Sequence, residues 1–491
     1  MTSDVCKSIV ERYRCPEEFA RRRFESANHS SPGFFKFGED VVCYGRSSRG
    51  TPCSHLNGNL NRNLVDVWNL MQASAEATGF PFDPDEIVNN LRQERYLAGT
   101  HSNALKASLA RIGRPVYYLL RPAMPAFLRA YAKKAHLAGW EKTPFPRWPV
   151  DTTVDLLLER LLELSLGEGK SRDIPFVWFW PDGYESCAVM THDVETAAGR
   201  DFIRTLMDLD ESRGVKASFQ IVPEERYAVD EKLLGEIRSR NFEVNVHDLN
   251  HDGHLFDDHR EFLTRVGKIN DYGRRYKAIG YRSGVMYRNQ DWYNAFEFEY
   301  DMSVPNVAHL DPQHGGCCTV MPYFIGNLLE LPLTTVQDYA LFHILKDHSI
   351  DLWKRQMEVI ERQHGIMSFV VHPDYVIAKR DRATFETLLD YLARWRDRGT
   401  LWFALPGEVN RWWRQRSKMR LIRQESGWTI HGEGSERARV AFAYLREGKL
   451  AYRIADVPGT SDPAAEGSRE VSVMTSMDWR HMSPQAAGYG D

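Results

Sequence analysis

The pattern of apolar and polar positions is most regular in the middle of the chain. From about residue 185 to 415, short apolar runs alternate with amphipathic helical stretches. The strand-like runs are SCAVMTHDV, KASFQIV, FEVNVH, AIGYR, a short one near Tyr300, LLELPL, IMSFVVH and TLWFAL. Helical patterns such as AGRDFIRTLMDLDESRG and DLWKRQMEVIERQHG lie between several of them. Strand–helix alternation repeated seven or eight times predicts a parallel sheet that closes into a barrel.

The first 150 residues show little strand signal. After a polar, glycine-containing stretch, helical patterns follow near 64–77, 84–98, 102–112 and 123–138. The proline-rich run KTPFPRWPVDTT marks a boundary, and DLLLERLLELSL after it has the pattern of an amphipathic helix. We therefore predict a mostly helical N-terminal region over 1–150 and a linker or strap over 151–184.

Beyond residue 415 the apolar positions alternate again. The runs KMRLIRQESGWTIHG, RVAFAYLRE and KLAYRIA predict a small antiparallel β module over 416–456. Residues 457–491 are rich in Pro, Gly, Ala and Ser, which predicts a disordered tail. The expected fold class is α/β, with a distorted parallel barrel of seven or eight β/α units over 185–415, a helical N-terminal region and a small β-rich C-terminal module.

Composition narrows the classes of protein. A chain of 491 residues with 43% hydrophobic and 26% charged residues is typical of a globular protein of more than one unit. The net charge of -4 supplies no basic field for nucleic acid. Seven cysteines without paired CxxC spacing argue against a disulfide framework or a structural zinc knuckle. We interpret the adjacent Cys317 and Cys318 as an inert loop feature.

No stretch of the sequence approaches the ~20 apolar residues that a membrane span needs. The first residues, MTSDVCKSIVERYRCPEEF, lack the apolar core of a secretory signal, so we expect a cytoplasmic protein. The segment 115–140 mixes apolar and basic residues. We interpret it as a helix that packs between domains, with peripheral contact to a membrane surface as the alternative. The oligomeric state stays open.

Two acids follow the first predicted barrel strand. In α/β barrels the active site lies where the strands end, because the loops that leave the strands converge there. The strand SCAVM ends in Thr191-His192-Asp193-Val194-Glu195. Of the two acids Asp193 and Glu195, one can ligate a metal while the other stays free as a base. The alternative is a helix N-cap, since acids are common just before a helix.

Histidines gather at the end of the strand FEVNV. His247, His251 and His254 lie within eight residues. The spacing of His247 and His251 puts two imidazoles on one face if the segment turns helically, which is a usual way to supply two nitrogen ligands. Two imidazoles and one carboxylate leave a coordination position open for water, as catalytic zinc sites require. We therefore predict His247 and His251 as metal ligands, with His251 and His254 as the alternative pair.

Three further strand ends carry polar residues. Arg282 ends AIGYR, where a buried cation could orient a carboxylate base. Asp301 and Ser303 follow Tyr300, and His372 follows IMSFVV, where it could protonate a leaving amine. Each also has an ordinary structural interpretation, as an ion pair, a turn residue or a buried core histidine.

Taken in order, these segments resemble the motifs of the polysaccharide deacetylases of the NodB homology type (carbohydrate esterase family four). The segment that carries them covers roughly residues 185–405. The matching runs are THDVE, HDLNH, YRSG, YDMS and VVHP. One departure concerns the first motif, whose common form has two adjacent acids, whereas here Val194 stands in the second place and Glu195 follows it. The third motif also lacks its usual proline, since Ser283 and Gly284 follow Arg282.

The resemblance implies a metal-dependent removal of N-acyl groups from sugars on a distorted (β/α) barrel. By position in the motifs, Glu195, His247 and His251 would hold the metal, zinc in the first place, with cobalt, manganese or nickel as alternatives. Asp193 would be the base held by Arg282, and His372 the general acid. The substrate-binding residues implied are Tyr281, Ser283, Tyr300 and Asp301, with a backbone N–H of 281–283 as a donor to the oxyanion.

The expected partner is an N-acylated sugar or glycan, in the metabolism of polysaccharides or surface glycans. A cytoplasmic location favours a nucleotide- or lipid-linked sugar over an extracellular polymer. Trp292, Tyr300 and Tyr375 are candidates for contacts with the sugar ring. Two alternatives remain, a hydrolase of cyclic amides on the same barrel and a catalytically degenerate barrel that binds glycan as a scaffold.

Overall fold

A computed structural model describes most of the chain. The described residues are 3–25, 31–56, 64–72, 79–97, 139–167, 172–425, 427–455 and 468–471. The helices predicted over 102–112 and 123–138 lie outside these residues, as do nearly all of 115–140 and most of the predicted tail. No helix within the described ranges has both the length and the apolar character needed to span a bilayer.

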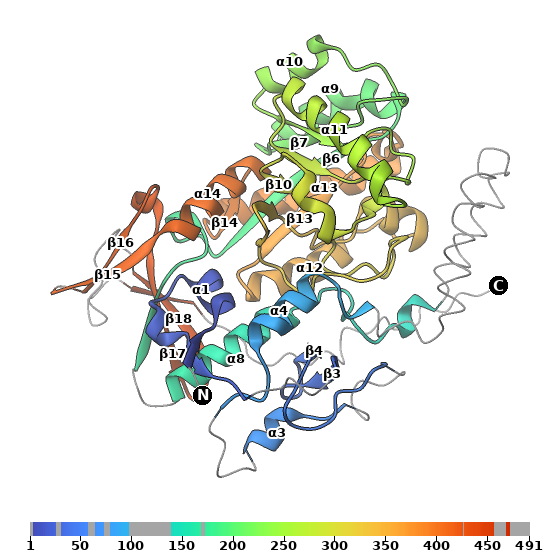
Figure 1. Ribbon diagram of the computed structural model, residues 1–491. Helices are drawn as coiled ribbons and strands as arrows, with labels where there is room; N and C mark the ends of the chain where they lie inside the picture. Colours follow the sequence, from blue (N-terminus) through green and yellow to red (C-terminus); the bar gives the residue numbers. More distant parts are fainter. Residues whose placement is uncertain are drawn as a thin grey trace.

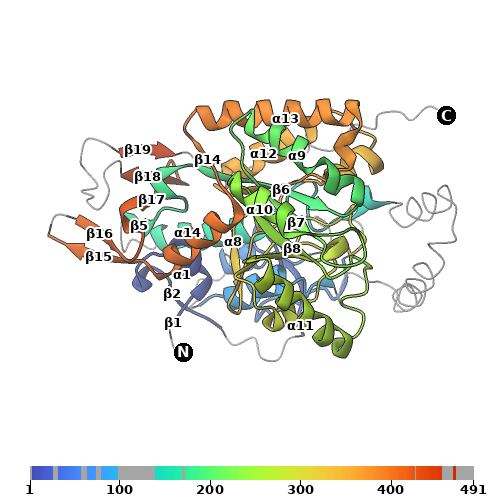
Figure 2. The same ribbon diagram turned by 90° about the horizontal axis from the view of Figure 1, so that it is seen from above.

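A curled, mainly parallel sheet forms the centre of the molecule (Figures 1 and 2). In order across the sheet its strands are β11 (Tyr323–Ile325), β12 (Leu328–Glu330), β10 (Tyr300–Asp301), β9 (Gly280–Arg282), β8 (Glu243–His247), β7 (Ala217–Ile221), β6 (Ser186–Val194) and β13 (Ile366–Val370). A further strand, β14 (Leu401–Phe403), pairs with β6 in parallel. All the predicted strands are present, and β11 is an addition that pairs antiparallel with β12. The predicted α/β class with a distorted parallel barrel is therefore confirmed.

The barrel is distorted at one seam. Strands β12 and β13, at the two ends of the parallel part of the sheet, are joined by threonine side chains that follow β12. Thr334 Oγ1 donates to the carbonyl of Ile366 at 2.7 Å and accepts from the N–H of Ser368 at 3.0 Å. Thr335 Oγ1 donates to the carbonyl of Ser368 at 2.7 Å. Two hydroxyls thus replace a backbone ladder and close the barrel.

Helices cover the outside of the sheet (Figure 2). They are α9 (Ala197–Glu211), α10 (Glu231–Ser239), α11 (His259–Arg275), α12 (Asp351–Arg362) and α13 (Lys379–Asp397). Side chains alternate along each strand, so Val244 and Val246 join the apolar layer beneath the helices while Asn245 and His247 face inward. The inner face at the C-terminal ends of the strands is therefore polar, and an active site can form there.

The N-terminal region contains both helices and short strands. Its helices are α1 (Lys7–Tyr13), α3 (Val67–Gln72) and α4 (Pro84–Arg92). Two antiparallel pairs, β1 (Ser3–Val5) with β2 (Arg21–Arg23) and β3 (Gly33–Lys36) with β4 (Val42–Gly45), were not expected from the sequence. Strands of three or four residues are too short to show a period of two, and β2 consists of three arginines.

The predicted linker contains regular structure. It supplies α8 (Thr153–Gly167) and the strand β5 (Asp173–Val177). Strand β5 pairs with β17 (Val440–Arg446), which continues to β18 (Lys449–Ala455) and β19 (Ser468–Val471) in a four-stranded antiparallel sheet. The C-terminal module is thus confirmed as antiparallel but takes a strand from each side of its predicted limits. Strand β19 lies inside the predicted disordered tail, a difference caused by its pairing with β18.

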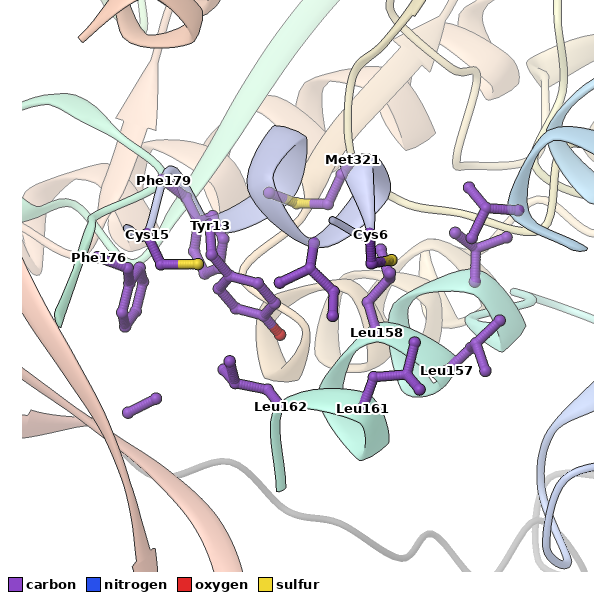
Figure 3. Close-up of a cluster of buried hydrophobic side chains, with 14 of the residues drawn as sticks. Cys6, Tyr13, Cys15, Leu157, Leu158, Leu161, Leu162, Phe176, Phe179 and Met321 are labelled. Atoms are coloured by element: carbon purple, nitrogen blue, oxygen red, sulfur yellow. The ribbon is translucent and has the colours of Figure 1, made fainter. Parts of the chain in front are cut away.

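Helix α14 (Pro406–Lys418) connects the barrel to this sheet, with the hairpin β15 (Arg420–Gln424) and β16 (Gly427–His431) following it. The N-terminal region, α8 and the C-terminal sheet share one hydrophobic core (Figure 3). Its residues shown there include Tyr13 of α1, Leu157 and Leu161 of α8, and Phe176 of β5. The predicted linker is therefore part of the core.

Candidate active site

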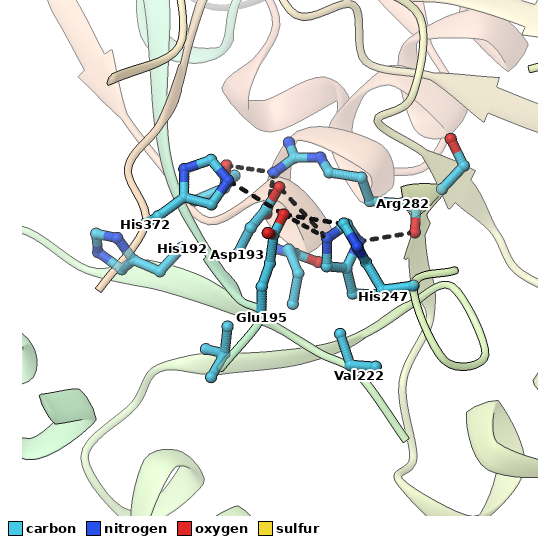
Figure 4. Close-up of polar contacts among 12 residues, drawn as sticks. His192, Asp193, Glu195, Val222, His247, Arg282 and His372 are labelled. Carbon is cyan, nitrogen blue, oxygen red and sulfur yellow. Dashed lines mark hydrogen bonds and ion pairs between the residues drawn. The ribbon is translucent and has the colours of Figure 1, made fainter. Parts of the chain in front are cut away.

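The first part of the site is the end of β6. Asp193 is 1% exposed, and Val194 is fully buried in the apolar layer outside the sheet. The carbonyl of Val194 accepts a hydrogen bond from Tyr227 Oη at 2.6 Å. Since side chains alternate along a strand, Asp193 and Glu195 both point to the inner face (Figure 4). The acid–Val–acid spacing therefore places two carboxylates side by side on the inner face, while Val194 packs into the apolar layer on the outer face.

The second part is the loop after β8. The prediction of a helical turn through His247 and His251 is wrong, because the strand ends at His247 and a loop follows. Asp248 and His251 have left-handed backbone angles, both with φ of 56°. The loop nonetheless brings the two imidazoles together, with ring centroids 4.8 Å apart. Arg226 fixes its backbone by donating to the carbonyls of Asn250 and His251.

A glycine of the neighbouring segment permits this loop conformation. A Cβ on Gly284 would lie 2.4 Å from Asp248 Oδ2 and 3.0 Å from His251 Cδ2. Any larger residue would push against the loop that carries His251. The Ser283-Gly284 sequence, which departs from the proline of the family motif, is thus in close contact with the site.

Glu195, His247 and His251 converge on one point. Glu195 Oε1 lies 2.9 Å from His251 Nε2 and 3.6 Å from His247 Nε2. Tetrahedral bonds of about 2.0–2.2 Å separate ligand atoms by roughly 3.3–3.6 Å. The distance to His247 matches this separation, and the distance to His251 is shorter. The Nε2 atoms of both histidines are buried and make no hydrogen bond of good geometry. Three ligand atoms that face one another without hydrogen bonding fit a metal ion between them.

The protonation of His247 suits this role. Its Nδ1 lies 3.1 Å from the carbonyl oxygen of Arg282. A carbonyl can only accept, so Nδ1 carries the proton and the lone pair of Nε2 points at Glu195 and Asp193. Asp193 Oδ2, 3.8 Å from His247 Nε2, is buried and has no hydrogen-bond partner. One oxygen of Asp193 is therefore directed at the centre of the cluster.

The other oxygen of Asp193 is held by Arg282. Arg282 Nη1 donates to Asp193 Oδ1 at 2.6 Å and to Thr191 Oγ1 at 2.8 Å, and Nε donates to the carbonyl of Met302 at 3.0 Å. Burial raises the pKa of Asp193, but Arg282, followed by His247 and His372, together outweigh burial and hold the pKa below its ordinary value. Asp193 is thus an ionised carboxylate with one oxygen fixed and one directed at the cluster, as a general base requires.

His372 lies on the other side of Glu195, with Nε2 3.3 Å from Glu195 Oε1. Its Nδ1 lies 2.6 Å from Asp338 Oδ1, and its backbone N–H donates to Asp338 Oδ2 at 2.7 Å. Burial lowers the pKa of His372, but Asp338 and then Glu195 raise it well above the ordinary value. The ring therefore carries a proton on Nε2 that faces the cluster.

Asp338 was missed in the sequence. It lies in TTVQDY, after the end of β12, where no strand pattern draws attention to it. It is fully buried and precedes a π-helical turn, Ala340–Ile344, a form often found at functional sites. The other acids were identified because they directly follow predicted strands. Asp338 does not, and its place near the site becomes clear only once the contact between β12 and β13 is known.

Three of the four predicted substrate-binding side chains do not reach the cluster. Tyr281 points outward and stacks on Phe296, with centroids 4.4 Å apart. Tyr300 bonds to Glu243 and Asn245, and Glu243 lies four residues before His247, or about 13 Å along the strand. Asp301 is fully buried and accepts a bond from Ser303 Oγ at 2.6 Å.

Ser283 lies beside the site, but its N–H is already engaged. It donates to Ser303 Oγ at 2.8 Å, so it is not free to bind an oxyanion as expected. Ser303 in turn donates to Asp301, and these two residues thereby support the backbone of the third motif. The fourth motif therefore positions the third motif and does not itself line the cluster.

His192, the remaining polar residue of the first motif, is buried on the outer face with Nε2 2.9 Å from Asp210 Oδ2.

The chain is similar in structure to polysaccharide deacetylases. One is a presumed polysaccharide deacetylase of Mycobacterium smegmatis, with 16% identity over 48% of this chain and 93% of that one and a TM-score of 0.39. The peptidoglycan deacetylase PdaC of Bacillus subtilis gives 12% identity over 47% and 93% of the two chains, with a TM-score of 0.30. Puue allantoinase gives 11% identity over 48% and 92%, with a TM-score of 0.40.

No protein-family model matches the sequence, and no curated protein matches it. The structural similarities are partial and the identities low. The function is therefore inferred from the geometry of the site and from the sequence motifs.

Proposed function

We propose that this protein is a metal-dependent hydrolase that removes an N-acyl group, such as acetyl, from an amino sugar. The observation that carries the proposal is the convergence of Glu195, His247 and His251 between an arginine-held carboxylate and an aspartate-held imidazole. Ligand, base and acid groups of this kind together are what hydrolysis of an unactivated amide needs, because water must be activated and the amine must be protonated as it leaves.

The residues of the cluster fit a divalent ion. Glu195 supplies an oxygen, and His247 and His251 supply two nitrogens, a set that suits zinc, with cobalt, manganese or nickel as alternatives. Asp193, Glu195 and His372 form a second, overlapping group of potential ligands. Because Arg282 already neutralises Asp193 and Asp338 already engages His372, we assign the ion to the first group. An ion held there supplies a Lewis acid that polarises a carbonyl and makes water more acidic.

Asp193 is the proposed general base. Its free oxygen, Oδ2, faces the cluster and can take a proton from a water molecule placed there. Arg282 keeps Asp193 ionised and fixes the direction of its carboxylate. The cost of burying this pair is lowered by the further bonds of Arg282 to Thr191 and Met302.

His372 is the proposed general acid. Its Nε2 proton faces the cluster, while Asp338 accepts from Nδ1 and fixes the plane of the ring. As the C–N bond breaks, this proton goes to the nitrogen of the sugar, which departs as an amine. Asp338 stabilises the imidazolium before the transfer.

A sugar fits beside the acid because aromatic rings form a wall there. Tyr375, half-buried, lies 4.7 Å from His372 between ring centroids, and Tyr339 lies 5.7 Å from Tyr375. Aromatic faces pack well against the C–H face of a pyranose, while polar edges reach its hydroxyls. Among the candidates for sugar contacts, Tyr375 alone adjoins the catalytic groups. Trp292 packs against His259 and Phe262, and Tyr300 lies at the opposite strand ends.

The test is release of acetate by purified protein loaded with zinc, cobalt or manganese. N-acetylhexosamines and their oligomers form one panel, and hydantoin and imide rings form the other. Asp193→Asn should lower kcat about 10²–10⁴-fold, the usual contribution of a general base. Asp252→Asn is the matched control, because Asp252 is next to His251 but pairs with Arg265.

Each outcome separates the alternatives. Ring opening without acetate release would replace the sugar amide with a cyclic amide. A protein that binds no stoichiometric metal, and that His247→Ala leaves unchanged, would be a glycan-binding scaffold. Acetate release that Asp193→Asn does not reduce would refute the assigned base.

A further inference from the structure

A cavity of about 240 Å³ lies between the N-terminal region and the barrel. The turn after α4 forms one wall, with Gln93, Glu94 and Arg95. The loops after β8 and β9 form the others, with Phe256 on the first and Tyr287 and Asn289 on the second. The cavity is slightly smaller than the ~300–1,000 Å³ of sites that enclose drug-sized ligands, which suits a ligand about the size of one sugar ring.

The cavity adjoins the metal-ligand cluster. Its Gly253 follows His251 by two residues, so the two Cα atoms lie within about 7 Å. On the other loop, Gly284 approaches the ring of His251, and Tyr287, three residues later, lines the cavity. Both loops that shape the metal cluster therefore also form this cavity, and one molecule could occupy the two places together.

The lining is polar but almost neutral. Glu94 and Arg288 are both buried and form an ion pair through Nε and Nη2 of the guanidinium group, so they cancel each other's charge. Arg95 and Asp291, exposed on opposite walls, lie 3.9 Å apart. Asp257 is the remaining charged residue of the lining, and it faces His254 at 2.7 Å. A nearly neutral lining does not favour a phosphate or another strongly charged ligand.

The polar groups are of the kind that binds hydroxyls. Gln93, Asn289, Gln290 and Gln313 supply side-chain amides. Gln313 is held at both amide atoms by the backbone of Arg288. The oxygens of Gln93 and Asn289 accept from Arg95 and from the N–H of Asp291, so these two residues offer their NH2 groups as donors. Gln290 donates through Nε2 to the carbonyl of Arg92 at 3.0 Å, while its buried Oε1 has no partner. Phe256 and Tyr287 add aromatic surface. Planar polar groups with aromatic surface match the alternating hydroxyl and C–H surface of a sugar.

We propose that this cavity binds a second sugar unit of the substrate, next to the unit that is deacylated. The substrate is then an N-acylated oligosaccharide or a longer glycan, and the N-terminal region selects it by forming one wall of the site. This inference rests on the proposed function. The two fail separately, because binding in the cavity does not require acetate release.

The test compares binding of N-acetylglucosamine and of its β-1,4-linked tetramer to the zinc-loaded full-length protein by calorimetry. The tetramer should bind at least 10-fold more tightly than the monomer. Arg95→Ala with Asp291→Ala removes the polar pair at the mouth, and Gln93→Trp fills the cavity. Each should weaken tetramer binding about 10-fold and leave monomer binding unchanged.

The matched control removes an equivalent pair elsewhere. Arg21 and Glu17 form an ion pair at 3.8 Å with side chains 54% and 65% exposed, against 58% and 77% for Arg95 and Asp291, and they lie outside the cavity. Arg21→Ala with Glu17→Ala should change neither affinity. Equal binding of monomer and tetramer by the unaltered protein, or undiminished tetramer binding by Gln93→Trp, would overturn the proposal. Tight tetramer binding without acetate release would retain it and refute the deacylase function.

Discussion

Replacement of His247 by alanine is the most direct probe of the metal centre. His247 is 1% exposed, and within the described part of the chain its directed interactions are Nδ1 with the carbonyl of Arg282 and Nε2 with the cluster. The substitution removes one of three protein ligands and leaves Glu195 and His251 in place. The matched control is His254→Ala, which tests the alternative histidine pair, because His254 is three residues beyond His251 and faces Asp257 instead.

The expected loss of metal affinity follows from the number of ligands. Structural zinc sites with four ligands bind with about 10–16 kcal/mol, or about 2.5–4 kcal/mol for each ligand. At about 1.4 kcal/mol for each factor of ten, His247→Ala should weaken zinc binding by about 10²–10³-fold. His254→Ala should change it by less than about threefold, since Nδ1 of His254 lies 2.7 Å from Asp257 and outside the cluster.

The measurement is competition for zinc with a chromophoric chelator, combined with a thermal melt to show that both variants are folded. A His254→Ala protein that loses zinc while His247→Ala retains it would reverse the assignment of ligands. Equal retention by both variants would contradict a metal site at this cluster.

Three further predictions concern residues around the site. Asp338→Asn should lower kcat on an N-acetyl sugar about 10²–10⁴-fold, because Asp338 holds the general acid His372. Hydrolysis of 4-nitrophenyl acetate should stay within tenfold, because nitrophenolate leaves without the proton of His372. An equal loss on both substrates would contradict the role of Asp338 in positioning the general acid. Gly284→Ala should weaken zinc binding about tenfold, measured by chelator competition, because its Cβ would displace His251, and unchanged affinity would show that the loop adapts. Burial raises the pKa of Glu159 to about 8, above its unfolded value. The free energy of unfolding, measured by urea titration, should therefore fall by up to about 5 kcal/mol between pH 4.5 and 8. Glu159→Gln should remove that part of the pH dependence.

Much of the fold could be predicted because the barrel strands have a clear period. The strands β6, β8 and β13 carry apolar runs bounded by polar loops, and all were identified. The short strands β3 and β19 were not, because four residues show no period and β19 exists only through its pairing with β18. The local pattern of apolar residues shows which secondary structure a segment favours by itself. Short strands such as these form only by pairing with strands far away in the sequence.

The site was predicted to the extent that it lies at strand ends. Glu195 is placed by the alternation of β6, a local property, and it faces the two histidines as expected. Asp338 could not be found in this way, because a seam of side-chain hydrogen bonds brings it to His372. Tyr300 was misplaced for a related reason. Tyr300 is the first residue of β10, and its side chain lies beside Gly280, the first residue of β9. It therefore lies at the N-terminal ends of the strands, away from the cluster at the C-terminal ends.

The shared core has a consequence for how the molecule can be divided. Arg416 of α14 is 1% exposed and donates to the carbonyls of Arg12 in α1 and of Val177 and Trp178 at the end of β5. A fragment cut at the sequence boundaries near 185 and 415 would end inside α14, before Arg416, and would lose the contacts of this helix with α1 and β5. The barrel is thus not an autonomous module, and the segments on either side of it are integral parts of the fold.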